Sequence, residues 1–182
     1  MKNSMPSSGR FRPLLIAASL TATVLLAAGT KSPDTCRTTL QLIDAESGER
    51  LPGVIRIRTP DGRQLPLPEL LSRGTGLPND LPIHDWSSLP RSTVVELPAT
   101  TLTIDAFSGI ETERLTTTVD LSSKSVATVQ LPLIRFHRRE HRNLVSGNTH
   151  LHLQKLSRED CDRYLTDIPK SDDLDVLFLS YL

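Results

Sequence analysis

Apolar and polar residues alternate along much of the segment 36–134, and this period of two restricts the fold of the chain more than any other feature. Side chains of a β-strand point alternately to its two faces, so each alternating run predicts a strand with one buried face. Ile55 and Ile57 alternate with two arginines in one such run, and comparable runs lie at 39–42, 101–106, 116–121 and 127–133. Turn-forming residues such as Pro60-Asp61-Gly62 separate the runs, which predicts a small β-sandwich over residues 36–134.

The alternation fails between Pro66 and Pro90, where Pro, Gly, Asn, Asp and Ser are frequent. We expect a long loop there, and long loops are often functional. Trp86 lies within it and is interpreted as a packing anchor for the loop, with a role in binding as the alternative.

The N-terminal segment 1–29 has the pattern of a secretory signal peptide. Lys2, Arg10 and Arg12 form a positive region without an acid, and a nearly unbroken apolar run follows from Leu14 to Ala28. The run is short for a membrane-spanning helix, which needs about 20 residues. We therefore expect an exported protein of the periplasm, the cell surface or the medium. A signal segment that stays as an inner-membrane anchor is the alternative, and the membrane is otherwise not expected as a partner.

Charge and cysteine content exclude several classes of protein. The 21 basic residues balance the 21 acidic ones, and loss of the signal segment leaves a net charge of about −3. Nucleic-acid binding, which usually requires a basic excess, is therefore not expected. Cys36 and Cys161 are the two cysteines. Export would permit a disulfide between them, but they fall in different predicted domains and are interpreted as separate thiols.

A basic segment, 135–144, is predicted to link the sandwich to the rest of the chain. Within it His137 and His141 are four residues apart and would share one face of a helix, a spacing that can bind a metal ion. No third ligand lies nearby, so a solvated or salt-bridged linker is the alternative that we prefer.

Residues 145–182 are predicted to form one strand–helix–strand unit. A strand is expected over 144–153, followed by a helix that begins after Ser157 and ends at Pro169. The continuous apolar run 176–179 is typical of a parallel strand that is covered on both faces. The predicted fold is therefore mainly β, with an N-terminal β-sandwich followed by one β-α-β unit.

His150 and His152 are the candidate metal ligands. The two residues are two positions apart on the predicted strand, so their side chains point to the same side of it. Two imidazoles on one side can converge on one divalent ion. A half-exposed strand with two incidental histidines is the alternative. The position of the pair in the second half of its strand favours a site, because open α/β folds bind ligands at the carboxyl ends of their strands. Asp172, Asp173 and Asp175 precede the second strand and are expected at the opposite end.

Two parts of the chain resemble known families. The stretch from Ile43-Asp44-Ala45-Glu46 to Gly53-Val54, with the Asp61-Gly62 turn, resembles transthyretin-like or carboxypeptidase-regulatory-like modules, which implies a spacer or binding module. Val145-Ser146-Gly147-Asn148-Thr149-His150-Leu151-His152 resembles the opening of the PHP (polymerase and histidinol phosphatase) superfamily, in its CehA/McbA-like branch. Asn148 stands where many members have Asp, and Ser180-Tyr181 where the second strand often ends in Asp-His.

The second resemblance implies an exported metal-dependent hydrolase of phosphoesters or related esters and carbamates. His150 and His152 would bind a divalent metal, Zn or Mn, if the domain were complete. The resemblance covers about 40 residues, a small part of an α/β barrel. We therefore expect the chain to be the N-terminal part of such a protein, itself inactive, with a truncated barrel and unknown catalytic residues. The alternative function is a non-catalytic exported β-sandwich that binds a surface polymer or a protein partner.

Overall fold

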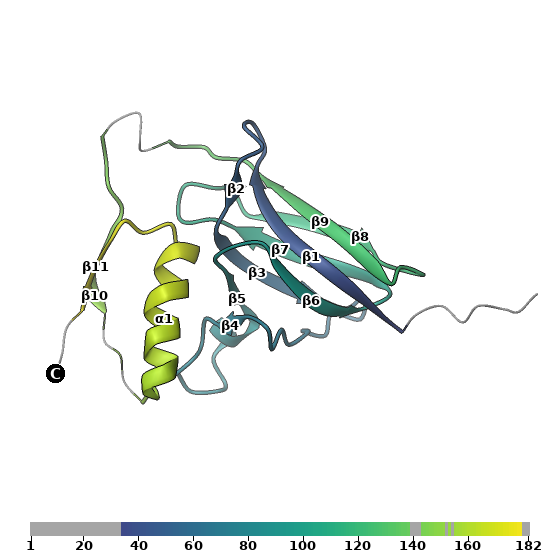
Figure 1. Ribbon diagram of the computed structural model, residues 1–182, viewed down its shortest axis with the longest axis horizontal. Coiled ribbons are helices and arrows are strands. Elements are labelled where there is room, and N and C mark those ends of the chain that lie inside the picture. Colours follow the sequence, from purple (N-terminus) through teal and green to yellow (C-terminus); the bar gives the residue numbers. More distant parts are fainter. Residues whose placement is uncertain (1–33, 139–142, 152, 154, 180–182) are drawn as a thin grey trace, which may run out of the picture. The chain divides into compact units, whose positions relative to one another are not determined.

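The computed structural model describes residues 34–138, 143–151, 153 and 155–179, and for His150 it describes the backbone alone. The described chain is mainly β with one α-helix, as predicted (Figure 1). The elements in chain order are β1 (Thr35–Asp44), β2 (Arg50–Leu51), β3 (Gly53–Arg58), β4 (Leu71–Ser72), the 3-10 helix η1 (Pro82–Asp85), β5 (Ser87–Leu89), β6 (Thr93–Pro98), β7 (Thr101–Phe107), β8 (Leu115–Asp120), β9 (Val126–Leu133), β10 (Gly147–Leu151), α1 (Arg158–Ser171) and β11 (Val176–Leu179).

The first sheet is built around β1. Strands β6 and β2 pair antiparallel with successive parts of β1, and β9 pairs parallel with it from Arg37 to Asp44. The second sheet has the order β4-β5-β3-β7-β8, and all its neighbouring strands are antiparallel. Every second residue of a strand faces the same side, so the register places Ile55 beside Ala106 on the inner face and Arg56 beside Asp105 on the outer face.

The core lies between the inner faces of these two sheets and is made of aliphatic side chains. Alternation along each strand supplies them, because one face of each sheet is removed from water and the other is not. Completely or almost completely buried are Leu40, Leu42, Ile55, Ile57, Leu89, Leu97, Leu102, Ile104, Leu131 and Leu133. The predicted β-sandwich is therefore confirmed as the architecture of this part of the chain.

The prediction of one long loop between Pro66 and Pro90 is wrong in part. Strands β4 and β5 lie within it, and β5 is paired with β3 through Gly53 and Leu89, Val54 and Ser88, and Ile55 and Ser87. These strands are only two and three residues long, too short for a period of two to stand out among prolines and serines. Strand β6 was also not predicted, although Val95 and Leu97 alternate within it and are buried.

The predicted strand–helix–strand unit is formed by β10, α1 and β11. The two strands are parallel, with Gly147 opposite Val176 and Asn148 opposite Leu177. Ser157 caps the helix as predicted, because its hydroxyl accepts the N–H of Asp160 at 3.1 Å.

The helix does not end at Pro169 as predicted but continues to Ser171. Proline lacks a backbone N–H and disfavours a helical backbone in the residue before it. Neither effect stopped the helix here, within its last turn. The carbonyl of Ile168 still accepts the N–H of Asp172.

Helix α1 packs on the outer face of the second sheet. It contacts β3, β4 and β5 (Figure 1). Val54 and Leu71 lie on these strands and are buried, although they do not belong to the core between the sheets. Ile168 is the buried apolar residue of the helix. The sandwich therefore provides a second apolar surface, and α1 covers it.

The basic segment after β9 is salt-bridged to the sandwich over its described part. The guanidinium of Arg138 lies 2.9 Å from the carboxylates of both Asp44 and Glu46. Arg135 is nine-tenths buried, 3.5 Å from Asp44 and 3.7 Å from Glu111. His141, half of the proposed histidine pair at 137 and 141, lies outside the described residues.

Candidate functional site

The candidate metal ligands belong to the end of β10. His150 is the last residue but one of this strand, so its backbone lies at the carboxyl end of a parallel pair. The side chain of His150 and the whole of His152 lie outside the described residues. Their convergence on a metal ion therefore stays a prediction.

The acidic residues before β11 lie at the opposite end of the same two strands. The backbone N–H of Ser146, just before β10, donates to the Asp175 carboxylate at 2.9 Å, and the Ser146 hydroxyl donates to the carbonyl of Asp173. Asp173 and Asp175 are thus held at the amino ends of β10 and β11, as expected. Within the part of the chain that the structure describes, no three His, Cys, Asp or Glu side chains group together as a metal site would require.

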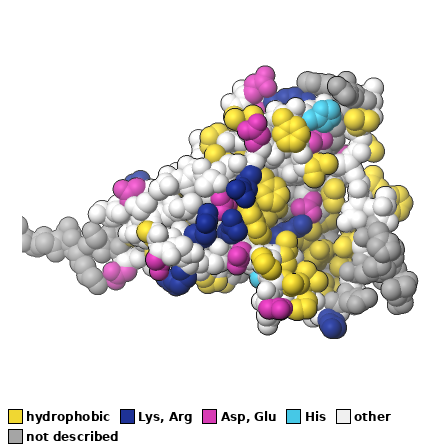
Figure 2. All heavy atoms as spheres, turned by 180° about the vertical axis from the view of Figure 1, so that it is seen from behind, with side chains coloured by type: hydrophobic (Ala, Val, Ile, Leu, Met, Phe, Trp, Pro, Cys, Tyr) yellow, Lys and Arg dark blue, Asp and Glu magenta, His cyan; other side chains and the backbone are white. Residues whose placement is uncertain are grey.

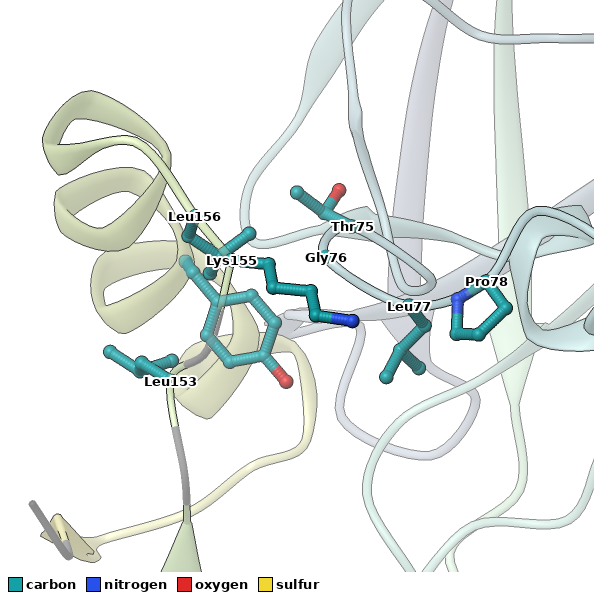
Figure 3. Close-up of a pocket in the computed structure, with 8 residues that line it drawn as sticks. Thr75, Gly76, Leu77, Pro78, Leu153, Lys155 and Leu156 are labelled. Atoms are coloured by element: carbon teal, nitrogen blue, oxygen red, sulfur yellow. The ribbon is translucent and has the colours of Figure 1, made fainter. Parts of the chain in front are cut away.

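A pocket of about 370 Å³ opens next to the carboxyl end of β10. One wall is the sandwich loop 75–78, and the other is formed by Leu153, Lys155 and Leu156, which follow β10, together with Tyr164 of α1. Figure 3 shows the Lys155 side chain crossing the pocket, with its nitrogen directed toward the loop that carries Leu77 and Pro78. The pocket is thus lined by three leucines and a proline, and Lys155 supplies the one ammonium group in that lining.

An ion pair lies close to this pocket, between Arg73 and Asp172. The guanidinium Nη1 is 2.9 Å from a carboxylate oxygen of Asp172, and both side chains are mostly buried. Burial raises the pKa of Asp172 above its usual value, and the charge and hydrogen bond of Arg73 oppose that rise. Burial also raises the pKa of the Tyr164 hydroxyl; the charge of Arg73 opposes this and that of Asp172 adds to it. Tyr164 therefore remains a neutral phenol at neutral pH.

Sequence reasoning did not single out this pocket. Neither Tyr164 nor Lys155 belongs to a motif that the sequence analysis connects with a site. The loop 75–78 and Lys155 are about eighty positions apart in the chain, so no local pattern joins them. The one local hint is the polar pair Gln154-Lys155 between Leu153 and Leu156, a few residues after the strand.

A second polar cluster lies on the outer face of the second sheet. Arg56 is stacked over the ring of Trp86 at 4.6 Å, and Trp86 meets Phe107 edge to face with their centroids 5.2 Å apart. The buried carboxylate of Asp105 accepts hydrogen bonds from Arg56 and Arg58. Figure 2 shows basic side chains gathered beside hydrophobic ones on the face seen from behind. Trp86 packs against the sheet, as its interpretation as an anchor implies.

Both carboxylate oxygens of Asp105 accept hydrogen bonds, from Arg56 and Arg58 on one side and from Thr116 on the other. Burial opposes ionisation of this carboxyl, but the hydrogen bond from Thr116 and the charges of Arg56 and Arg58 outweigh it, so the pKa of Asp105 lies below its usual value.

Cys36, buried in the core, and Cys161, on α1, are free thiols.

Comparison with known proteins found no matching family model and no matching curated protein. Among solved structures, the chain is similar to a mutant of the shaft pilin spaA from Lactobacillus rhamnosus GG, with 16% sequence identity and a TM-score of 0.34. The similarity covers 57% of this chain and 52% of the pilin chain, so this chain spans about half the length of that structure. Separately, none of the helices in the described ranges is long and apolar enough to cross a membrane.

Proposed function

We propose that this chain supplies the sandwich and the first strand–helix–strand unit of an exported, PHP-like, metal-dependent hydrolase. The observation that carries the proposal is the position of the His-x-His motif. Its first residue, His150, lies at the carboxyl end of β10, which is paired in parallel with β11. Ligands of α/β folds bind at that end of the strands. The apolar run 14–28 at the N-terminus supports export.

The donor set suits a zinc-type ion. Two imidazoles are ligands for Zn²⁺ and Mn²⁺, and a catalytic zinc usually takes three protein ligands and one open position. His150 and His152 would supply two of these, and Asp173 and Asp175 are held at the other end of the strands. When bound, the metal would lower the pKa of a water molecule and so provide a nucleophile for ester or phosphoester hydrolysis. Two histidines fall short of that number of ligands, so we expect the 182 residues alone to bind the ion only weakly and not to turn over a substrate.

The exposure of β11 also supports a larger α/β domain. Val176 is 39% and Phe178 57% exposed, although strands of a parallel sheet are normally covered on both faces. The other side of β11, which carries Leu177 and Leu179, is half-buried. A further layer of structure against the exposed side would complete the arrangement that the PHP resemblance implies.

Zinc binding tests the proposal directly. Calorimetric titration of the chain with Zn²⁺ is expected to show one site that is lost in both His150→Ala and His152→Ala. His84→Ala is the matched control, because His84 lies in η1 and belongs to neither candidate histidine pair, and it should bind as the unaltered chain does. Equal zinc binding in all three variants would overturn the proposal.

A non-catalytic binding module is the second candidate function. It is favoured by the partly exposed cluster of Arg56, Arg58 and Trp86 on the outer face of the second sheet. Reading the gene beyond codon 182 and measuring the mass of the native protein would separate the two candidates. A longer frame with further His and Asp motifs supports the hydrolase, and a native chain without them supports the binding module.

A further inference from the structure

We propose that the pocket between loop 75–78 and Lys155 binds an organic anion with a compact apolar body, such as an aryl phosphate monoester. Lys155 would pair with the anionic group, and the leucine, proline and tyrosine side chains would contact the apolar body. As a statement about the substrate, this inference rests on the proposed hydrolase function. As a statement about binding, it rests on the pocket alone.

The dimensions of the pocket fit a small molecule. Its volume of about 370 Å³ lies in the range of ligand sites, which is roughly 300–1,000 Å³. Its two walls come from parts of the chain that fold as different elements, the loop after β4 and the segment between β10 and α1. Such junctions are preferred positions for ligand sites.

The charge of the lining selects an anion. Lys155 is the one charged residue among the eight that line the pocket, and no carboxylate is among them to neutralise it. The hydroxyl of Thr75, another lining residue, already donates to the carbonyl of Ser72 at 2.7 Å. An ammonium group over apolar walls favours a negatively charged partner, because charge-assisted hydrogen bonds are about twice as strong as neutral ones.

The backbone at Lys155 has an unusual conformation. Its φ angle is +58°, in the left-handed region that costs a side-chain-bearing residue roughly 1–2 kcal/mol. Strained residues of this kind persist where neighbouring structure determines them, and they gather at functional sites. Here Ser157, two residues later, anchors the start of α1 by its cap. Lys155 lies just before this cap, and its side chain extends across the pocket (Figure 3).

The location connects the pocket to the proposed reaction. Leu153 is the second residue after the last one of β10, so the pocket lies at the same end of the strand as His150. A substrate whose anionic group pairs with Lys155 would be bound at the end of the sheet where the metal motif lies. The loop 75–78 would then make the sandwich part of the substrate site, because it forms the opposite wall.

Ligand-detected NMR with phenylphosphonate, in the presence of EDTA, tests the pocket without any metal. We expect saturable binding that Lys155→Met weakens about tenfold, which is the usual size of one lost charge-assisted bond. Lys155→Arg should retain most of the affinity, and Lys170→Met, which removes an exposed lysine outside the pocket, should leave it unchanged. Benzyl alcohol and inorganic phosphate should each bind at least about tenfold more weakly, because each lacks one of the two contacts.

A second variant protects the test against misfolding. Leu77 is 48% exposed on the opposite wall, so Leu77→Asp should fold normally while placing a carboxylate in the pocket. It should abolish phenylphosphonate binding and leave the thermal midpoint unchanged within about 2 °C. Unchanged binding in both Lys155→Met and Leu77→Asp, or equal binding of benzyl alcohol, would overturn the inference. Zinc binding without anion binding would contradict this inference alone, and anion binding without zinc binding would contradict the proposed function alone.

Discussion

The guanidinium of Arg73 lies 2.9 Å from the carboxylate of Asp172, 99 positions further along the chain. This ion pair joins the loop after β4 to the end of α1. Arg163 adds a second contact, donating to the carbonyl of Glu69 at 3.2 Å. The helix is therefore held on the second sheet by polar contacts as well as by the apolar residues that it covers.

Arg73→Met is expected to destabilise the chain by about 1–2 kcal/mol at neutral pH, between the values of exposed and buried ion pairs. Burial raises the pKa of Asp172, so this residue favours the folded state below pH 3.8 and loses that effect as the pH rises through its raised pKa. Removing Arg73 raises the pKa of Asp172 further, so more stability of the folded state is lost as the pH rises. The deficit of the variant should thus be small at pH 3 and largest near pH 7, measured by thermal unfolding. If Asp172→Asn does not restore stability to the Arg73→Met chain, the ion pair is not the cause.

Asp105→Asn should destabilise the sandwich by about 2–3 kcal/mol at pH 7, because two arginines and Thr116 lose a buried carboxylate. The pKa of Asp105 is lowered in the folded chain, so its contribution is present above pH 3.8 and lost as the pH falls through the folded value. Urea titrations at pH 7 and pH 3 should show the variant and the unaltered chain converging in acid. The exposed Asp80→Asn is the control, with a change below about 0.5 kcal/mol. A deficit that persists unchanged at pH 3 would argue against the charge.

Gly109→Ala should weaken the attachment of α1 to the sandwich. Gly109 has a φ of +55°, and an added Cβ would lie 2.9 Å from the Cβ of Asp173 and 3.0 Å from the carbonyl oxygen of Asp172. Gly48→Ala is a matched control, because Gly48 also has a positive φ but nothing lies within 4 Å of its added Cβ. We expect about 1 kcal/mol of strain in the control and about 1–3 kcal/mol more in Gly109→Ala. If urea unfolding shows equal losses of stability in the two variants, Asp172 and Asp173 can move away from the added Cβ without destabilising the chain.

Ser157→Ala should cost about 1 kcal/mol, because the N–H of Asp160 loses its hydrogen-bond acceptor at the start of α1. Hydrogen exchange of the first-turn amides should quicken, while exchange in β1 and β9 stays as it is. Ser157→Asp should restore protection, since aspartate caps helices equally well. If Ser157→Asp exchanges as fast as Ser157→Ala, another group supports this helix end.

Local patterns predicted most of the longer regular elements, although not β6. The alternation of Ile55 and Ile57 with Arg56 and Arg58 predicted β3 and its buried face, and Ser157 with Asp160 predicted the start of α1. Strands β4 and β5 were missed because two or three residues carry no detectable period. The end of α1 was misplaced because the usual effect of Pro169 did not stop the last turn.

The candidate site divides in the same way. The His-x-His motif and its place late in a strand are properties of neighbouring residues and could be predicted, and the joint geometry of His150 and His152 stays a prediction. The acids at the far end of the strands were also predicted, because chain order alone places Asp173 and Asp175 before β11. The pocket was not, because it depends on the left-handed backbone of Lys155 and on its distant partner loop.

By itself, then, the sequence determined the mainly β class, the faces that the longer strands bury, and the strand–helix–strand order after residue 145. Each of these follows from interactions between residues a few positions apart, and such interactions are visible in the sequence as a hydrophobic period or a helix-capping residue. Only the tertiary structure decided the pairing of Arg73 with Asp172, the packing of α1 on the second sheet, and the pocket between Leu77 and Lys155. These depend on which surfaces meet when apolar area is removed from water, and no local pattern in the chain encodes that choice.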